Sequence, residues 1–459
     1  MECEGQESHD PESEFLHKLF AALNTSGVHY AVMRNYEPLP FSSGGSDLDI
    51  YVPAVEAKIA YQSLFMVVSG TNSKVIGVVR TWNFFEAYII GYRNGQWWGI
   101  CVEFYHGIVF KSTVELVDNS VLPDLFERHH GISVISQDAG NTIGYIKEIL
   151  AHNRFREDKP QYKQSAAYLA GKNTDYFLKY FSPLGERSQM LLLKTLATAP
   201  QAVVTQQIKQ FRCYVLISAF LKSPFKYLYR RLGHEFYRLS RYFRPPGSVI
   251  AILGVDGAGK STVINAILPA LNAATHNAVV VQHLRPTLLP PLARLKGKKH
   301  LSTGPVLEPH GSTPSGTVFS LLRLIYLTCD YLAGYWLWTR LRIAKQPTVV
   351  IFDRYAYDMA LDQRRFRIRL PQRVVEWFVA MAPKPDLIFC LHGDPEILAA
   401  RKGELPLEET RRQVNALREF ARREPRAVLI STDTSIEETR DQVLQTLCTF
   451  LEKRAQERL

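Results

Sequence analysis

A glycine-rich turn followed by Lys-Ser-Thr lies near the middle of the 459-residue chain, between an apolar run and a helical pattern. The run from Ser248 to Leu253 predicts a strand, and the pattern that continues through Leu268 predicts a helix. This is the strand–turn–helix context that G-x-x-x-x-G-K-[ST] requires. The backbone N–H groups of such a turn point inward at a helix start, where the helix dipole favours an anion. The predicted phosphate-binding residues are Gly254, Gly257, Ala258, Gly259, Lys260, Ser261 and Thr262.

Two side chains of this turn are suited to phosphoryl transfer. Lys260 is placed to reach the β- and γ-phosphates of a nucleotide, and the Ser261 hydroxyl is placed to ligate Mg²⁺. ATP and Mg²⁺ are therefore the expected cofactors. The alternative is a glycine-rich turn that matches the motif by chance.

The turn belongs to a C-terminal region in which apolar runs alternate with helical patterns. Continuous apolar runs predict a parallel sheet that helices cover on both faces. Ligands of such sheets bind beyond the carboxyl ends of the strands. Arg285, Asp353 to Tyr355 and Asp394 each follow one of the runs, so we expect them at the ligand-binding end. The five runs are Val249 to Leu253, Ala278 to Val281, Thr348 to Phe352, Asp386 to Leu391 and Ala427 to Ile430.

A pair of carboxylates, Asp47 and Asp49, marks the N-terminal part of the chain. Alternation along a strand places both acids on one face. They repel each other unless a cation lies between them, so a divalent metal is a natural ligand. Glu103, on a later strand-like run, is a third carboxylate that can join the pair. The alternative is that the acids are solvated on an edge strand. The strand-like runs that follow the pair are Val75 to Arg80, Phe84 to Tyr92 and Trp97 to Tyr105.

The sequence Gly-Ser-Asp-Leu-Asp-Ile-Tyr-Val around this pair resembles the nucleotidyltransferase fold of polymerase-β type, over residues 14–110. The resemblance implies that Asp47, Asp49 and Glu103 bind Mg²⁺ and a nucleoside triphosphate. In that family the Gly-Ser stands on a turn well before the acids. Here it directly precedes Asp47, and Arg34-Asn35-Tyr36 occupies the earlier place. We therefore expect a metal site that binds nucleotide only weakly.

Helical patterns replace strand patterns from Ile143 to Tyr242, with breaks at proline residues. The last pattern, Phe225 to Phe243, has an apolar stripe at steps of three and four, and basic residues over the rest of its surface. We expect the stripe to pack on a neighbouring domain and the arginines to be solvated. The alternative is weak contact with an anionic membrane surface. The stripe is Phe225, Leu228, Leu232, Phe236, Leu239 and Phe243, and the basic residues are Lys226, Arg230, Arg231, Arg238, Arg241 and Arg244.

The glycine-rich turn with its internal Asp256, together with Asp353-Arg354-Tyr355, resembles the thymidylate kinase branch of P-loop kinases over residues 248–450. The resemblance implies that Asp256 and Asp353 lie near the acceptor and the metal, and that Arg354 holds phosphoryl oxygens. It also implies substrate contacts from Arg285 and Tyr355. The alternatives are that Asp353 caps a helix and that Arg354 pairs with a nearby acid.

The same resemblance implies a basic lid over the transferring group, formed by Arg401, Lys402, Arg411 and Arg412. The alternative is that these residues are ordinary solvated helix charges. The chain inserts prolines and lysines over residues 290–314, where such kinases hold the acceptor, so a different or bulkier acceptor is expected. The fused arrangement resembles bacterial thymidylate-kinase-like proteins associated with surface-polysaccharide genes, which implies a sugar or glycan precursor.

Composition restricts the compartment and the partners. Six cysteines without a C-x-x-C pair favour a reducing cytoplasm, and the acidic N-terminus is unlike a signal peptide. The longest apolar stretch, Val318 to Trp338, contains Arg323 and Asp330, so it predicts a buried helix rather than a bilayer span. The net charge is +11, and residues 209–247 hold nine lysines and arginines against one acid, Glu235. Such patches suit phosphate-rich ligands or anionic lipid, and nucleic acid is the least supported partner.

These patterns together predict an α/β protein. We expect an N-terminal α+β domain over residues 1–135, a helical connecting domain over 136–246 and a P-loop domain over 247–459. The expected function is ATP- and Mg²⁺-dependent phosphotransfer to a nucleotide, nucleoside or sugar-type small molecule. The alternatives are a nucleotidyltransferase with a regulatory P-loop domain, and a nucleotide-switched module on a membrane surface. The sequence does not indicate an oligomeric state.

Overall fold

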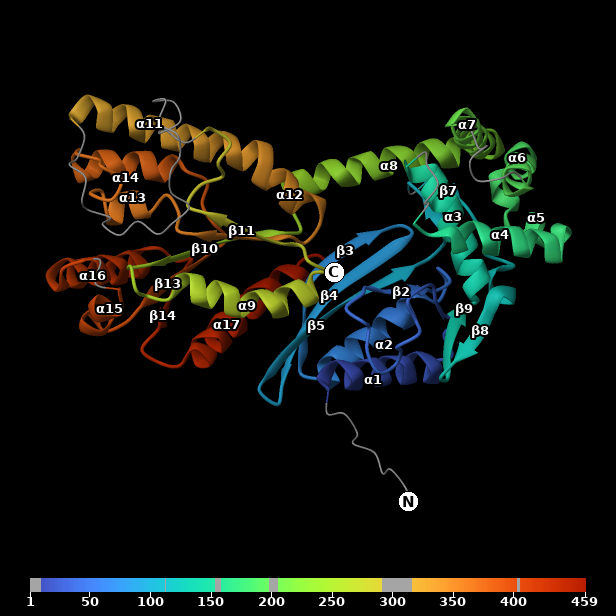
Figure 1. Cartoon of the computed structure of the whole chain (residues 1–459), viewed down its shortest axis with the longest axis horizontal. Helices are drawn as coiled ribbons and strands as arrows, with labels where there is room; N and C mark the ends of the chain where they lie inside the picture. Colours follow the sequence, from blue (N-terminus) through green and yellow to red (C-terminus); the bar gives the residue numbers. More distant parts are fainter. Residues whose placement is uncertain (1–9, 112, 153–157, 198–204, 291–315, 403–404) are drawn as a thin grey trace, which may run out of the picture. The chain divides into compact units, whose positions relative to one another are not determined.

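The computed structural model describes residues 10–111, 113–152, 158–197, 205–290, 316–402 and 405–459 (Figure 1). The chain divides into two compact units, Met1–Leu239 and Ser240–Leu459. The boundary falls inside helix α8 (Pro224–Phe243). The charged insertion predicted over residues 290–314 lies almost wholly outside the described residues.

A seven-stranded mixed sheet forms the centre of the first unit, in the order β3-β4-β5-β2-β1-β9-β8. Its three long strands pair antiparallel in succession and correspond to the three strand-like runs of the sequence. β2 pairs parallel with β5, and this register sets Asp49 directly opposite Glu103. The strands are β1 (Ala31–Val32), β2 (Leu48–Tyr51), β3 (Ser73–Thr81), β4 (Phe84–Arg93), β5 (Gln96–Tyr105), β8 (Phe126–His129) and β9 (Ile132–Ile135).

Helices complete the first unit. α1 (Pro11–Thr25) and α2 (Ala57–Gly70) pack against each other and against the long strands, and α1 buries its apolar face, including Phe15 and Leu19. A second group of helices follows the sheet and shares a core with it. Pro160 and Pro224 are the first residues of helices, a position at which no backbone hydrogen bond is lost. These helices are α3 (Gln137–His152), α4 (Pro160–Lys172), α5 (Thr174–Tyr180), α6 (Glu186–Ala197) and α7 (Thr205–Lys222).

The second unit confirms the predicted fold class. Its five-stranded sheet is entirely parallel, in the order β11-β12-β10-β13-β14. The sheet shares a core with α11 (Thr317–Gly334), α14 (Gln372–Met381) and α16 (Leu407–Arg423), while α9 (Lys260–Ala274) and α17 (Ile436–Gln456) pack together on the other face (Figure 1). The strands are β10 (Ser248–Gly254), β11 (Val279–His283), β12 (Val349–Asp353), β13 (Leu387–His392) and β14 (Ala427–Ser431).

The apolar stretch that begins in α11 has two different faces. Leu324, Leu327 and Tyr331 are buried in the core, and the wholly buried Asp330 accepts a hydrogen bond from Arg285 at 2.6 Å. Val318 and Phe319 are largely exposed. Within the described residues, 317–345 form the single helical stretch long and apolar enough to cross a membrane. The predicted buried helix is therefore found on one face only.

The expectation that the stripe of α8 packs on a neighbouring domain is wrong. No residue of α8 is buried, and the stripe ranges from 46% exposed at Leu228 to 88% at Phe225. The polar face contacts the protein instead. Arg230 donates to Glu115 at 2.9 Å and stacks on Trp82, with its guanidinium carbon 3.9 Å from the ring centroid. The ion pair and the ring stacking of Arg230, rather than apolar packing, therefore attach α8 to the first unit.

Candidate functional site

The glycine-rich turn connects β10 to α9 in the second unit. Gly257 and Gly259 have φ values of 87° and 74°, a region that side chains other than glycine rarely adopt. A Cβ atom at Gly257 would lie 2.6 Å from the Leu398 carbonyl oxygen, so a larger residue also lacks space. The geometry leaves the N–H groups at the start of α9 without intrahelical partners. An anion therefore meets both free donors and the positive end of the helix dipole.

This turn lines a cavity of 760 Å³ at the carboxyl ends of the parallel strands. The cavity gathers residues that are far apart in the sequence, which is the convergence expected for a nucleotide site. Six of its residues were predicted from the turn itself. The full lining is Asp256, Gly257, Ala258, Gly259, Lys260, Ser261, Thr262, Val263, His283, Asp353, Arg354, Arg365, Arg401, Thr432, Thr434, Ile436 and Thr439.

The ammonium group of Lys260 is buried, with the residue only 8% exposed. Its Nζ donates to the carbonyl oxygens of Gly254 at 2.8 Å and Val255 at 3.0 Å. Burial, and next the positive charge of Arg354, lower the pKa of Lys260 to about 7. A phosphate beside Nζ would favour the charged form, because its negative charge offsets the cost of burial and the repulsion from Arg354. Lys260 is therefore held in a place where an anionic ligand improves its surroundings.

The carboxylate of Asp353 fits a metal ligand. Its Oδ2 lies 3.3 Å from Nδ1 of His283, while its buried Oδ1 has no hydrogen-bond partner among the described residues. Burial raises the pKa of Asp353, but the His283 hydrogen bond and the Lys260 charge outweigh it and leave the pKa below its ordinary value. Asp353 is thus an anion with one unpaired oxygen, and it lines the same cavity as Ser261. Mg²⁺ prefers such oxygen ligands.

Asp256 lies between two arginines. One oxygen accepts from Arg354 and the other from Arg365, both through short hydrogen bonds. Burial opposes ionisation of Asp256, but the charges of Arg354, Lys260 and Arg365 together lower its pKa. Arg354 also pairs with Asp358 at 3.4 Å, so the pairing with an acid that we considered as an alternative does occur. The pairing does not withdraw Arg354 from the site, because Arg354 also lines the cavity.

The backbone of Arg354 is strained. Its φ is 72°, in the left-handed region where a side chain costs about 1 kcal/mol or more. Its amide donates to the Ile252 carbonyl oxygen at 3.0 Å, and Asp358 accepts from the next amide, that of Tyr355, at 3.0 Å. These contacts hold the turn after β12 in its unusual conformation. The result is a guanidinium fixed at the cavity wall.

Sequence reasoning missed several residues of this cavity. Arg365 belongs to a basic run after β12 that gave no indication of which cation points inward. His283 is the last residue of β11, and Thr432 and Thr434 follow the end of β14. The rule that ligands bind at the carboxyl ends of parallel strands applied to all three, although none carries a motif.

Several predicted residues do not line the cavity, Gly254 and Asp394 among them. Arg285 is 9% exposed and bonded to Asp330, and Tyr355 is 1% exposed, with its hydroxyl donating to the Pro383 carbonyl oxygen. Neither lines the cavity, because each is committed to the fold. Of the predicted lid, Arg401 lines the cavity and donates to the Thr432 carbonyl oxygen at 3.2 Å. The side chain of Lys402 lies outside the described residues. Arg411 and Arg412 pair with acids on their own helix: Arg411 with Glu408 at 3.2 Å, and Arg412 with Glu409 at 2.7 Å.

The first unit brings Asp47, Asp49 and Glu103 together, as predicted from strand alternation. One oxygen of each lies within 4.8 Å of the others. Burial, and then the charge of Asp49, raise the pKa of Glu103 to about 9. Arg34 donates to Asp49 through a short bond and to Asp47 at 3.2 Å, so an arginine supplies the cation between the acids. Asp49 and Arg34 also line a cavity of 390 Å³ that includes Lys147.

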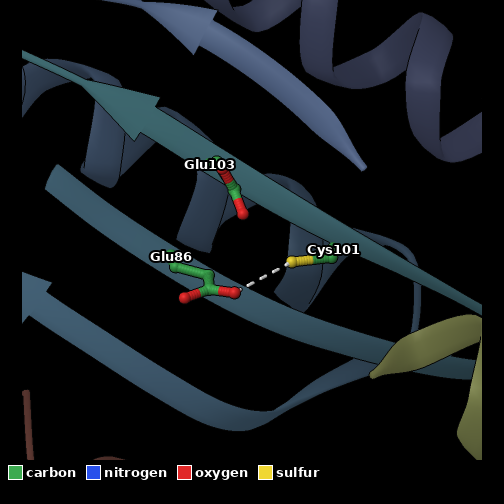
Figure 2. A group of neighbouring side chains, drawn as sticks. All are labelled: Glu86, Cys101 and Glu103. Atoms are coloured by element: carbon green, nitrogen blue, oxygen red, sulfur yellow. Dashed lines mark hydrogen bonds between the residues drawn. The ribbon is translucent and has the colours of Figure 1, made fainter. Parts of the chain in front are cut away.

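A second cluster shares Glu103. Figure 2 shows Glu86 and Cys101 beside it, with the Cys101 thiol donating to Glu86 Oε1 at 3.7 Å. The strand register sets Glu86 directly opposite Glu103. Burial, and then the Glu86 charge, raise the pKa of Cys101 well above its usual value. The thiol therefore stays protonated, and the neighbouring carboxylates of Glu86 and Glu103 repel each other when ionised.

Comparisons with known proteins reach only part of the chain. No protein-family model matches it, and no curated protein does. Among solved structures, thymidylate kinase from Ehrlichia chaffeensis aligns at 16% identity and a TM-score of 0.32, over 44% of this chain and 100% of that one. Thymidylate kinase from Candida albicans aligns at 17% identity and a TM-score of 0.34, over 45% of this chain and 93% of that one.

Proposed function

We propose that residues 247–459 are an ATP- and Mg²⁺-dependent phosphotransferase of the thymidylate kinase-like class. The supporting observation is the convergence on one cavity of the glycine-rich turn, buried Lys260 and the unpaired oxygen of Asp353. Neither a buried lysine nor an unpaired carboxylate oxygen stabilises a ligand-free fold. A bound metal–nucleotide would satisfy both.

Each residue of the cavity has a separate task in this proposal. The N–H groups of the turn bind the phosphate chain, and Lys260 places positive charge on its β- and γ-phosphates. Ser261 and Asp353 would hold Mg²⁺, which when bound neutralises charge on the phosphate oxygens. Arg354 and Arg365 present guanidinium groups to the transferring phosphoryl group. Phosphoryl transfer requires little more of a protein than such positioning and charge.

The two aspartates differ in what they offer the acceptor. Both oxygens of Asp256 are occupied by arginines, so Asp256 positions Arg354 and Arg365 and is a poor proton acceptor. Asp353 keeps one oxygen unpaired within the described residues. We therefore assign contact with the metal or the acceptor hydroxyl to Asp353. The acceptor class stays broad: a nucleotide, a nucleoside or a sugar-type molecule such as a glycan precursor.

Calorimetric titration of the full chain with Mg·ATP tests the proposal. Wild type should bind one nucleotide, and Lys260→Ala should weaken binding by about tenfold or more, because a buried charge on the phosphates is lost. Lys453→Ala on the exposed side of α17 is the matched control and should bind as wild type. Equal binding by wild type and Lys260→Ala would remove the basis of the proposal.

The carboxylates of the first unit support a second candidate function, nucleotidyl transfer. Its observation is the approach of Asp47, Asp49 and Glu103 to within 4.8 Å. Burial, and then the Asp49 charge, raise the pKa of Glu103, and a divalent metal would offset both by stabilising the ionised carboxylate. Arg34 would have to leave the acids for this metal to bind. Release of pyrophosphate from nucleoside triphosphates in Lys260→Ala, and its loss in Asp49→Asn, would support this activity. Pyrophosphate release that persists in Asp49→Asn would exclude it.

A further inference from the structure

Helix α8 presents its apolar face to solvent. The stripe residues Phe225, Leu232 and Phe236 are 88%, 69% and 73% exposed. Most half-buried residues of α8 recur at steps of three and four on the opposite side, namely Tyr227, Arg230, His234, Tyr237 and Arg241; Glu235, Ser240 and Tyr242 are half-buried as well. An amphipathic helix of a globular protein normally turns its apolar side inward. α8 has the opposite orientation, so its apolar stripe is exposed and is available to bind an apolar partner.

Cations flank the exposed stripe. Lys226, Arg231 and Arg238 are exposed along α8, and Arg244 is exposed directly after it. The single acid of α8, Glu235, pairs with both Arg231 and Arg238 at 3.0 Å. One carboxylate cannot neutralise two guanidinium groups, so positive charge remains beside the apolar residues. Long basic side chains can reach lipid headgroups while the stripe enters the acyl boundary.

The last turn of α8 belongs to the second unit, where it lies beside a further exposed apolar patch. Arg340 donates to the carbonyl oxygens of Tyr242 at 2.7 Å and Phe243 at 2.6 Å, which fixes this turn beside residues 335–345. Here Trp336 is 48%, Leu337 63% and Leu341 55% exposed. Tryptophan next to arginine is typical of membrane–water interfaces. The patch therefore has the same amphipathic chemistry as the stripe.

We propose that α8 binds the surface of an anionic lipid bilayer. Large apolar side chains on one face, basic residues beside them and low overall hydrophobicity are the features of a helix that lies in the interface. A second copy of the chain fits less well, because a symmetric contact would bring two strongly basic segments together. Nucleic acid would leave the apolar stripe uncovered. This inference is independent of the phosphotransferase proposal.

Co-sedimentation of the full chain with vesicles tests the inference. Wild type should bind phosphatidylcholine vesicles that contain phosphatidylserine, and bind vesicles of phosphatidylcholine alone at least about tenfold more weakly, because several cations meet the anionic surface. Added salt should reduce the binding, since the screening length shortens. Equal partition onto both kinds of vesicle, or none onto either, would overturn the inference.

Substitutions test whether vesicle binding depends on the stripe and its basic residues or on non-specific adsorption. Leu232→Ser with Phe236→Ser should lower partition onto anionic vesicles by about tenfold or more, and Arg231→Gln with Arg238→Gln by a similar factor. Met66→Ser on α2, 63% exposed, is the control and should partition as wild type. All these side chains are solvent-exposed, so the variants should fold, which circular dichroism checks.

The same variants distinguish a protein partner from a membrane. Light scattering should give the same mass for wild type and for Leu232→Ser/Phe236→Ser in solution. A larger wild-type mass that falls in the stripe variant would identify a second copy as the occupant and overturn the inference. Unchanged vesicle binding by the stripe variant would overturn it as well.

Discussion

Side chains around the phosphate-binding turn are arranged for a ligand rather than for the stability of the free fold. Lys260 is buried against two carbonyl oxygens, Asp353 keeps one oxygen unpaired among the described residues, and Arg354 occupies a strained conformation. Each feature costs free energy in the ligand-free chain. A metal–nucleotide offsets the first two, and the fixed arginine is then ready for the transferring group.

The pKa of Lys260 leads to a prediction about stability and pH. Because its folded pKa, about 7, lies below the ordinary value of 10.5, the unfolded state binds more protons between these values. The contribution of Lys260 to stability therefore rises with pH over this window and is least favourable below pH 7. Lys260→Met should unfold at a higher temperature than wild type at pH 7, and the difference should shrink toward pH 9.

Thermal melts at several pH values, with and without Mg·ATP, check this expectation. Mg·ATP should stabilise wild type more than it stabilises Lys260→Met, because the variant binds the nucleotide more weakly. A variant that melts below wild type at every pH would show that Lys260 supports the fold, and would refute the description of its burial as a cost.

Arg354 allows the backbone and the side chain to be tested apart. Arg354→Ala and Arg354→Gly both remove the guanidinium, so both should abolish phosphotransfer. Only glycine relieves the left-handed φ of 72°, so Arg354→Gly should be more stable than Arg354→Ala by about 1 kcal/mol. Urea unfolding measures the difference. Equal stability, or a more stable alanine variant, would mean that the conformation is not strained.

At the scale of secondary-structure elements, the sequence predicted the second unit well. Its five strands are continuous apolar runs, a pattern that local composition reveals, and the glycine-rich turn has the spacing and context of a known motif. The three long strands of the first unit were found for the same reason. β8 and β9 were not predicted, because these four-residue strands have weak local patterns.

Errors arose where long-range contacts decide the outcome. Arg285 was predicted to contact substrate from its place after β11, but its partner Asp330 lies 45 residues away on α11. The orientation of α8 was predicted from its apolar stripe, whereas a contact with Glu115 and Trp82 turns the other face inward. Arg365 was missed because nothing local distinguishes it from neighbouring arginines. Periodicity gives the faces of an element but does not give its neighbours.

The pair of Arg285 and Asp330 gives a prediction at this scale. Arg285→Met leaves the wholly buried carboxylate without its cation, so the second unit should lose about 3 to 5 kcal/mol of stability. Arg285→Met with Asp330→Leu should recover most of the loss, since two apolar residues then pack together. Urea denaturation of both variants measures this. If Arg285→Met is as stable as wild type and only its KM for the acceptor is raised, Arg285 binds substrate instead.

On the scale of the whole molecule, the chain carries two candidate sites, one in each compact unit. Calorimetry of the full chain should therefore show two transitions that respond to different ligands. Mg·ATP should raise the midpoint temperature of one transition only, and Lys260→Ala should reduce this rise. Mn²⁺ alone should raise the other, and Asp49→Asn should reduce that rise. A single transition that shifts equally with both ligands would contradict separate sites.

Transfer of the labelled γ-phosphoryl group of ATP by the full chain tests the phosphotransferase claim most directly. The acceptors to be tested are nucleoside monophosphates, nucleosides and sugars, and hydrolysis of ATP measures transfer to water. Wild type should transfer or release label at a rate at least ~10²-fold above Lys260→Ala, as expected when a charge on the phosphates is removed. Lys453→Ala should match wild type. Equal rates for wild type and Lys260→Ala across the panel, water included, would contradict the claim.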